Sequence, residues 1–251
     1  IFILFLILTL ILFFFLNKET TRKIGINYEV INYKIPTYLK LSDFFNRHFE
    51  YKYLIKKITN NEKIIENKIL DTSKWVYINI KKIPKGVDVV DHHPLTIAKR
   101  RLGNQDQFND ILSVFLVYQD IDSFFVNKFN DINHSLTLFK INDYWSLIDP
   151  YNGFYFINKN KKFASLEELK KTDWEIVKLD SNEIEHSKLI SNYKELKFYY
   201  QKIFNNIQSS EQIENTHIFK RGGRSYIQKP LNRLKYQIYL KLNDLKARMY
   251  L

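Results

Sequence analysis

Two polar residues, His134 and Asp149, have the types and positions that acyl chemistry would need. His134 begins one strand-like run, and Asp149 ends the strand-like run that follows it. A carboxylate that orients an imidazole makes it a general base, which can activate a nucleophile at the start of a neighbouring helix. Gln105 stands at such a helix start. A thiol nucleophile is excluded, because the chain contains no cysteine.

An amphipathic helix and a set of antiparallel strands are expected to position these residues. Apolar side chains recur three or four residues apart from Phe108 to Leu116, as on one face of a helix. Strand-like runs follow at 123–129, 134–141, 144–148 and 154–157. The pair Asn142 and Asp143 predicts a hairpin turn, across which the histidine and the aspartate can face each other. This order predicts an α+β fold with a central helix packed on an antiparallel sheet.

Short motifs in this stretch resemble the transglutaminase-like superfamily, which has a papain-like cysteine fold, and in particular its bacterial membrane-anchored type. The motifs are Gly103–Gln107, His134-Ser135 and Trp145–Pro150, with further likeness at Asp91–Pro94 and Ser165–Leu169. In that family a cysteine at the helix start is the nucleophile, a histidine is the base and an aspartate orients it. The resemblance therefore implies that Gln105 stands at the nucleophile position, beside His134 as base and Asp149 as orienting acid.

Gln105 departs from this pattern, because a carboxamide is not a nucleophile at neutral pH. The main hypothesis is a catalytically degenerate pseudoenzyme that uses its cleft for binding or scaffolding near a membrane. Gln105 offers a donor and an acceptor, which suit a peptide, amide or glycan ligand. An alternative is a hydrolase or acyl-transfer-type enzyme in which His134 and Asp149 act without a cysteine. Neither hypothesis requires a cofactor.

The first part of the chain is expected to hold it at a membrane. Residues 1–16 are apolar except for Thr9 and predict a single-pass transmembrane anchor, with the side of the membrane unresolved. Sixteen helical residues span about 24 Å, slightly less than a hydrocarbon core of about 30 Å. Residues 24–71 predict a helical lead-in. A transglutaminase-like core over 72–180 then follows, with a strand at Trp75–Ile80.

The last part of the chain, residues 185–251, predicts a basic helical extension. It is expected to contain a helix over 185–207, a polar linker over 209–216 and a second helix from Leu231. From His217 onward there are nine Lys or Arg and one acid, Asp244. A basic amphipathic helix can bind anionic lipid or an acidic protein. A third hypothesis is therefore a membrane-tethered interaction module that acts through this extension.

The charge of the chain does not by itself indicate nucleic acid. The formal net charge is +12, which can favour nucleic acid or an anionic membrane surface. The sequence has no arginine-rich arm, aromatic RNA-binding motif or zinc-finger spacing, so nucleic acid is not an expected partner. The adjacent His92 and His93 do not predict a metal site, because neighbouring side chains on an extended strand point to opposite faces.

Overall fold

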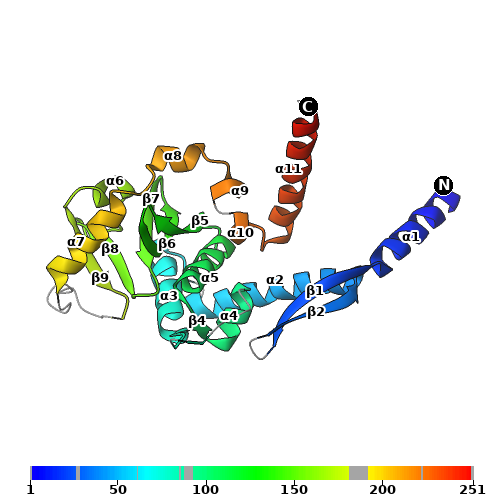
Figure 1. The fold of residues 1–251 in the computed structure, drawn as a ribbon, viewed down its shortest axis with the longest axis horizontal. Helices are drawn as coiled ribbons and strands as arrows, with labels where there is room; N and C mark the ends of the chain where they lie inside the picture. The colour runs from blue at the N-terminus through cyan, green and yellow to red at the C-terminus, as the bar shows by residue number, and fades with distance from the viewer. Residues whose placement is uncertain are drawn as a thin grey trace.

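The computed structural model places helix α5, Gln105–Tyr118, against a five-stranded antiparallel sheet (Figure 1). The structure describes residues 2–26, 29–60, 62–84, 86–87, 93–180, 192–221 and 223–249. The strands lie in sequence order: β5 (Ser123–Phe129), β6 (Ile132–Ile141), β7 (Tyr144–Asp149), β8 (Phe154–Asn158) and β9 (Trp174–Lys178). The predicted α+β arrangement of helix on antiparallel sheet is confirmed, and the four predicted strands correspond to β5–β8.

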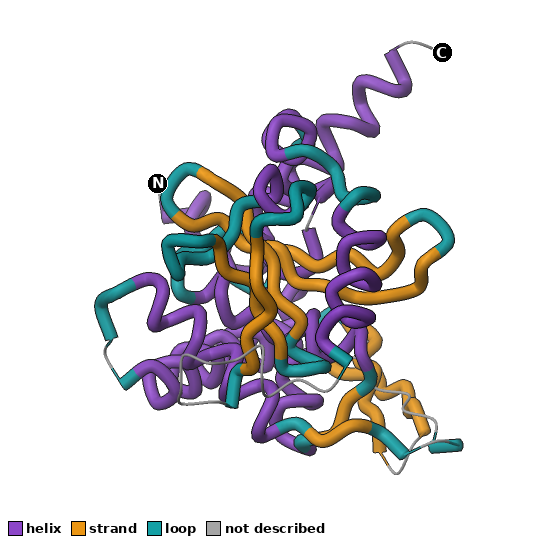
Figure 2. Tube along the Cα trace, turned by 90° about the vertical axis from the view of Figure 1, so that its left-hand side faces the viewer, coloured by secondary structure: helices purple, strands orange, loops and turns teal. Residues whose placement is uncertain are grey.

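The sheet is buried on both faces, and helices lie on both sides of its strands (Figure 2). Side chains alternate between the faces along β6. Leu136 and Leu138 belong to an apolar cluster with Tyr200, while Phe139 belongs to a second cluster with Ile111 of α5. Alternate positions of one strand therefore reach different helices, and this sets which helix each polar side chain of the site can contact.

Helix α5 begins at a capping box. The Asn104 side chain accepts a hydrogen bond from the Gln107 backbone N–H, and the Gln107 side chain accepts one from the Asn104 backbone N–H. Gly103 precedes the cap in a crowded position, where an added Cβ would lie 3.3 Å from Ile97 Cγ2. The first turn of α5 is thereby fixed, and Gln105 is the first residue of the helix.

The segment before α5 is partly different from the prediction. Its elements are α1 (Phe2–Asn17), β1 (Glu19–Ile26), β2 (Glu29–Pro36), α2 (Thr37–Thr59), α3 (Ile65–Asn79), β3 (Lys81–Lys82), α4 (Pro94–Arg100) and β4 (Leu102–Gly103). The expected helical lead-in over 24–71 therefore includes part of a β-hairpin. The predicted strand at Trp75–Ile80 is wrong. Its residues continue α3, which buries Ile69, Thr72 and Val76 at helical spacing.

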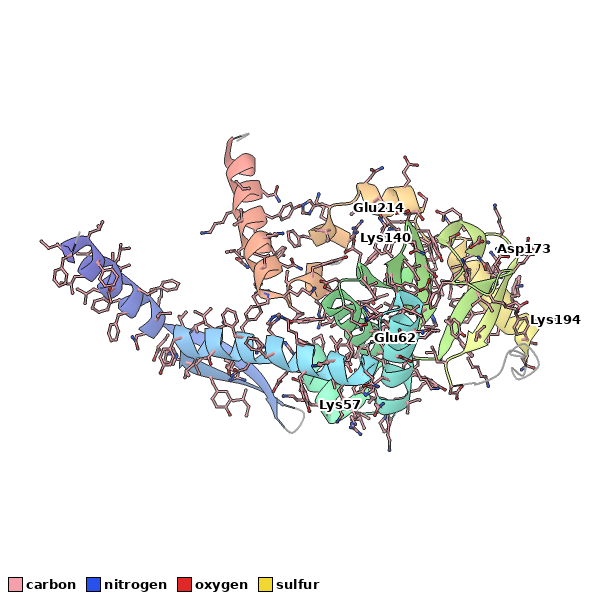
Figure 3. All side chains as sticks on the ribbon, turned by 180° about the vertical axis from the view of Figure 1, so that it is seen from behind. Lys57, Glu62, Lys140, Asp173, Lys194 and Glu214 are labelled. Atoms are coloured by element: carbon pink, nitrogen blue, oxygen red, sulfur yellow. The ribbon has the colours of Figure 1, made fainter. Side chains whose placement is uncertain are left out.

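Helix α1 carries exposed apolar side chains along its whole length, and Figure 3 shows them projecting around the helix. Within the described residues, no helix combines the length and apolar character needed to cross a membrane. The predicted transmembrane span at residues 1–16 is therefore not supported. Sixteen residues rise about 24 Å, against a hydrocarbon core of about 30 Å.

The remaining helices follow β8 in the chain. They are α6 (Leu166–Leu169), α7 (Tyr193–Phe204), α8 (Ser210–Asn215), α9 (Ile218–Arg221), α10 (Gly223–Tyr226) and α11 (Pro230–Met249). Of these, α6, α7 and α8 contribute to the apolar cluster on the second face of the sheet, α10 packs against α5, and α11 is the long terminal helix. Residues 181–191, where the predicted first helix begins, lie outside the described residues. The predicted linker over 209–216 is wrong, because Ser209 caps α8 through a capping box with Gln212. Beside it, Lys140 and Glu214 form an ion pair of 3.0 Å (Figure 3).

Candidate functional site

The structure brings together all three residues that the sequence singled out. His134 Nε2 lies 2.8 Å from Asp149 Oδ2, and His134 Nδ1 lies 3.0 Å from Gln105 Nε2. Gln105 comes from the start of α5, while His134 and Asp149 come from the paired strands β6 and β7. The imidazole therefore lies between a carboxylate and a carboxamide.

Asp149 is fully buried and accepts hydrogen bonds on both oxygens. Oδ1 accepts from the backbone N–H groups of Tyr151 and Asn152 at 3.1 and 3.0 Å. Oδ2 accepts from Tyr200 Oη at 2.6 Å and from Asn152 Nδ2 at 2.9 Å, in addition to His134. Burial by itself would raise the pKa of Asp149. The hydrogen bonds from His134, Tyr200 and Asn152 together outweigh burial and hold this pKa below its ordinary value.

The ionised carboxylate fixes the tautomer of the imidazole. Because Asp149 only accepts hydrogen bonds, His134 Nε2 must carry the proton that the two share. In the neutral ring, Nδ1 is then an acceptor. The Gln105 amide donates to Nδ1 at 3.0 Å, and Tyr199 Oη donates to the same nitrogen at 3.1 Å. Both ring nitrogens are thus engaged by groups of the protein itself.

Two tyrosines of α7 complete the site, and neither was identified as functional from the sequence. Tyr199 and Tyr200 meet the His134 ring edge to face, with centroids 5.6 and 5.8 Å away. Tyr200 is buried, and desolvation, reinforced by the charge of Asp149, raises its pKa well above the ordinary value. The sequence predicted a helix over 185–207, which contains both tyrosines. It contained no signal that either tyrosine would reach the histidine.

A second polar network attaches the first turn of α5 to β6. Asn109 Nδ2 donates to the backbone carbonyls of Gln105 and Ser135 at 2.9 and 3.1 Å. Thr137 Oγ1 donates to Asn109 Oδ1 at 2.8 Å, and Ser135 Oγ donates to Asp106 Oδ1 at 2.6 Å. These contacts hold the backbone of Gln105 in register with the strand that carries His134. They also direct the Ser135 hydroxyl to Asp106 and not to the imidazole.

The chemical capacity of the site follows from what touches the imidazole. The His134 residue is 5% exposed, so little solvent reaches the ring. At the position where a nucleophile would meet Nδ1 there is a carboxamide, which does not attack carbonyl groups at neutral pH. The Tyr199 hydroxyl is also within reach, but burial first, and then the charge of Asp149, raises its pKa and disfavours the phenolate. The arrangement therefore holds a base without an effective nucleophile.

The histidine pair upstream has a different environment. His93 Nδ1 accepts a hydrogen bond from the Leu95 backbone N–H and caps α4, while His92 lies outside the described residues. Among the described side chains, no three His, Asp or Glu residues are grouped as metal ligands would be. The role that the structure shows for His93 is at the start of a helix.

Comparison with known proteins does not assign the chain to a family. No protein-family model and no curated protein matches it. Among solved structures, it is similar to a protein described as a TGase, with a TM-score of 0.36 and 12% identity over 69% of this chain and 49% of the other. It is also similar to a candidate protease from Parabacteroides distasonis, with a TM-score of 0.33 and 12% identity over 67% of this chain and 40% of the other. The chain thus spans half or less of these proteins, and neither likeness is close enough to carry function across.

Proposed function

We propose that this chain is a transglutaminase-like protein that has lost catalysis and uses its framework for binding or scaffolding near a membrane. The observation that carries the proposal is the 3.0 Å contact between Gln105 Nε2 and His134 Nδ1. A carboxamide occupies the place where the family resemblance implies a thiol, and it donates its hydrogen bond to the base that a thiol would use.

The retained His134–Asp149 pair supports a structural role in this proposal. A buried carboxylate is costly unless it is hydrogen-bonded, and Asp149 accepts from several donors. Through these bonds the pair joins β6, β7 and α7. Selection for a stable framework therefore accounts for both residues without any turnover.

In this proposal, a ligand binds at the rim of the site and not at the imidazole. Gln105 is partly exposed, while its neighbours Asn104 and Asp106 are exposed. The amide oxygen of Gln105 and the polar groups beside it can accept from, and donate to, a peptide, amide or glycan. The imidazole is covered by Tyr199, so a ligand here would meet the start of α5 first.

The membrane part of the proposal rests on α1. Large apolar side chains from Phe2 to Phe15 are between 48% and 78% exposed, which is unfavourable in water unless a lipid phase or another protein covers them. Association of α1 with lipid gives this surface an apolar environment. A second surface for an anionic lipid or an acidic protein is the basic α11, where Arg233, Lys235 and Lys241 lie on one helix.

The test of lost catalysis is an acyl-transfer assay on the unmodified chain, on His134→Ala, on Gln105→Cys and on Gln105→Cys with His134→Ala. The substrate is a glutaminyl peptide with a fluorescent primary amine, and the readout is covalent incorporation of the amine. We expect no turnover by the unmodified chain. Turnover by the unmodified chain that is lost in His134→Ala would overturn the proposal and favour the enzyme that acts without a cysteine.

A further inference from the structure

A groove of about 820 Å³ lies between α2 and α11, away from the His134 site. Its walls are largely apolar, and the apolar residues that line them include Leu41, Phe44 and Phe45 from α2 and Pro230, Leu231 and Leu234 from α11. Phe45, Leu231 and Leu234 are exposed. The groove is therefore an apolar surface that nothing in the described part of the chain covers.

Cations accompany these apolar walls. Lys40, Arg47 and Arg233 line the groove, and no Asp or Glu is among the described residues that line it. Within the described part of the chain, the Lys40 ammonium donates only to neutral oxygens, Thr20 Oγ1 at 3.1 Å and the Thr21 carbonyl at 2.9 Å. Its positive charge is therefore not neutralised by a contacting carboxylate.

The two arginines are also incompletely balanced. Burial lowers the pKa of Arg47, and Asp43 opposes that effect. However, the Asp43 carboxylate already forms an ion pair with Arg22, so it is shared between two guanidinium groups. Arg233 is exposed and forms no ion pair with any residue that the structure describes. The groove thus has an excess of positive charge next to apolar side chains.

The walls are fixed to the body of the molecule. Tyr118 Oη of α5 donates to the Gln228 carbonyl at 2.9 Å, just before α11 begins. Lys229 Nζ forms an ion pair with Asp120 Oδ1 at 2.6 Å. Beyond this attachment, α11 extends away from the body (Figure 1). The groove therefore lies at the anchored end of α11, where its two walls are held in place.

We infer that this groove binds a single-chain phospholipid with an anionic headgroup. Its volume lies within the range of roughly 300–1,000 Å³ that is usual for small-molecule sites, which are mostly apolar with a few polar groups. An acyl chain fits the leucine and phenylalanine walls. A phosphate fits the cations, because its charge and several acceptor oxygens suit guanidinium and ammonium groups. This inference does not depend on the loss of catalysis proposed for Gln105.

The test uses the full chain and a single-chain phosphatidylglycerol with a fluorophore on its acyl chain, kept below its micelle-forming concentration. Leu234→Asp places an acid in the groove, and Leu242→Asp makes the same change on an equally exposed part of α11 outside it. Arg233→Glu and Lys235→Glu form a second pair, of which only Arg233 lines the groove. Far-UV circular dichroism checks that each variant retains its helices.

We expect Leu234→Asp and Arg233→Glu to weaken binding of the probe by about tenfold or more. The control variants Leu242→Asp and Lys235→Glu should change binding by less than about threefold. Equal losses within either pair would overturn the inference, because binding would then be at another surface, such as α1. A probe with a zwitterionic choline headgroup should bind more weakly than the anionic one, and equal binding would contradict the role of the cations. Displacement of the probe by oleate as effectively as by unlabelled phosphatidylglycerol would overturn the assignment of a phosphate headgroup.

Discussion

Removal of one hydroxyl group, in Tyr200→Phe, measures how strongly the site stabilises the fold. Tyr200 is buried and donates to Asp149 Oδ2 at 2.6 Å. The substitution keeps the ring and its packing against Phe156 and Phe204. The loss is therefore confined to a hydrogen bond between a neutral donor and a buried carboxylate.

The magnitude follows from the type of bond. A hydrogen bond to a charged group contributes about 1.5–3 kcal/mol, and Asp149 retains His134, Asn152 and the Tyr151 backbone as donors. We expect the free energy of unfolding to fall by about 2 kcal/mol. For a chain of this length, that corresponds to a decrease in Tm of about 4–8 °C.

The assay is urea unfolding followed by circular dichroism at several pH values. The pKa of Asp149 is held below its ordinary value in the folded state, so the carboxylate contributes stability above its unfolded pKa of about 3.9. That contribution is lost as the pH falls through the lower, folded pKa. The difference in the free energy of unfolding between the unmodified chain and Tyr200→Phe should therefore be largest near pH 7 and should shrink below about pH 4.

Tyr199→Phe is the matched control. Tyr199 is the neighbouring residue on α7 and is 38% exposed. It donates a hydrogen bond to His134 Nδ1, which also accepts one from the Gln105 amide. Its loss should cost about 0.5–1 kcal/mol. An equal cost for the two substitutions, or a cost for Tyr200→Phe that does not change with pH, would refute the reasoning.

Two further predictions concern other buried positions. Gly153→Ala should destabilise the chain by about 1–3 kcal/mol more than Gly86→Ala in urea unfolding. Both glycines have positive φ, but only at Gly153 would a Cβ meet another residue, 2.6 Å from the Tyr77 ring. Asp110 is buried beside Arg224, and burial raises its pKa to about 7 despite that cation. Between about pH 4 and pH 7 the folded state therefore keeps a proton on Asp110 that the unfolded state releases. The free energy of unfolding should fall as the pH rises through this range, and it should fall less in Asp110→Asn.

The central helix and its sheet could be predicted because their sequence patterns are local. The stripe from Phe108 to Leu116 and the alternating strands β5 to β8 bury regular faces, and these match α5 and the sheet. The contact between His134 and Asp149 could also be predicted, because a hairpin turn joins their strands. The contacts of Tyr199 and Tyr200 with His134 and Asp149 could not be predicted, because these tyrosines reach the site from α7, a helix that follows the sheet.

Two of the secondary-structure errors have physical explanations. The buried face of α3 includes Thr72 and Ser73, whose hydroxyls donate to backbone carbonyls one turn earlier. Because these two buried residues are polar, the apolar side chains of α3 do not recur at helical spacing along its whole length in the sequence. The remaining Trp75–Ile80 run then had the composition of a strand. In α8 the polar composition is typical of a linker, and only the capping box at Ser209 indicates a helix.

The measurement that tests the central claim most directly is the rate at which iodoacetamide alkylates Gln105→Cys as a function of pH. The chain has no cysteine of its own, so the measured thiol alkylation is that of the introduced cysteine alone. If position 105 faces the base, the apparent pKa of the thiol should lie below about 7.5, and His134→Ala should raise it toward the ordinary value of about 8.5. Asp106→Cys, on the same helical turn, should not respond to His134→Ala. A thiol at position 105 that also ignores His134→Ala would contradict the account.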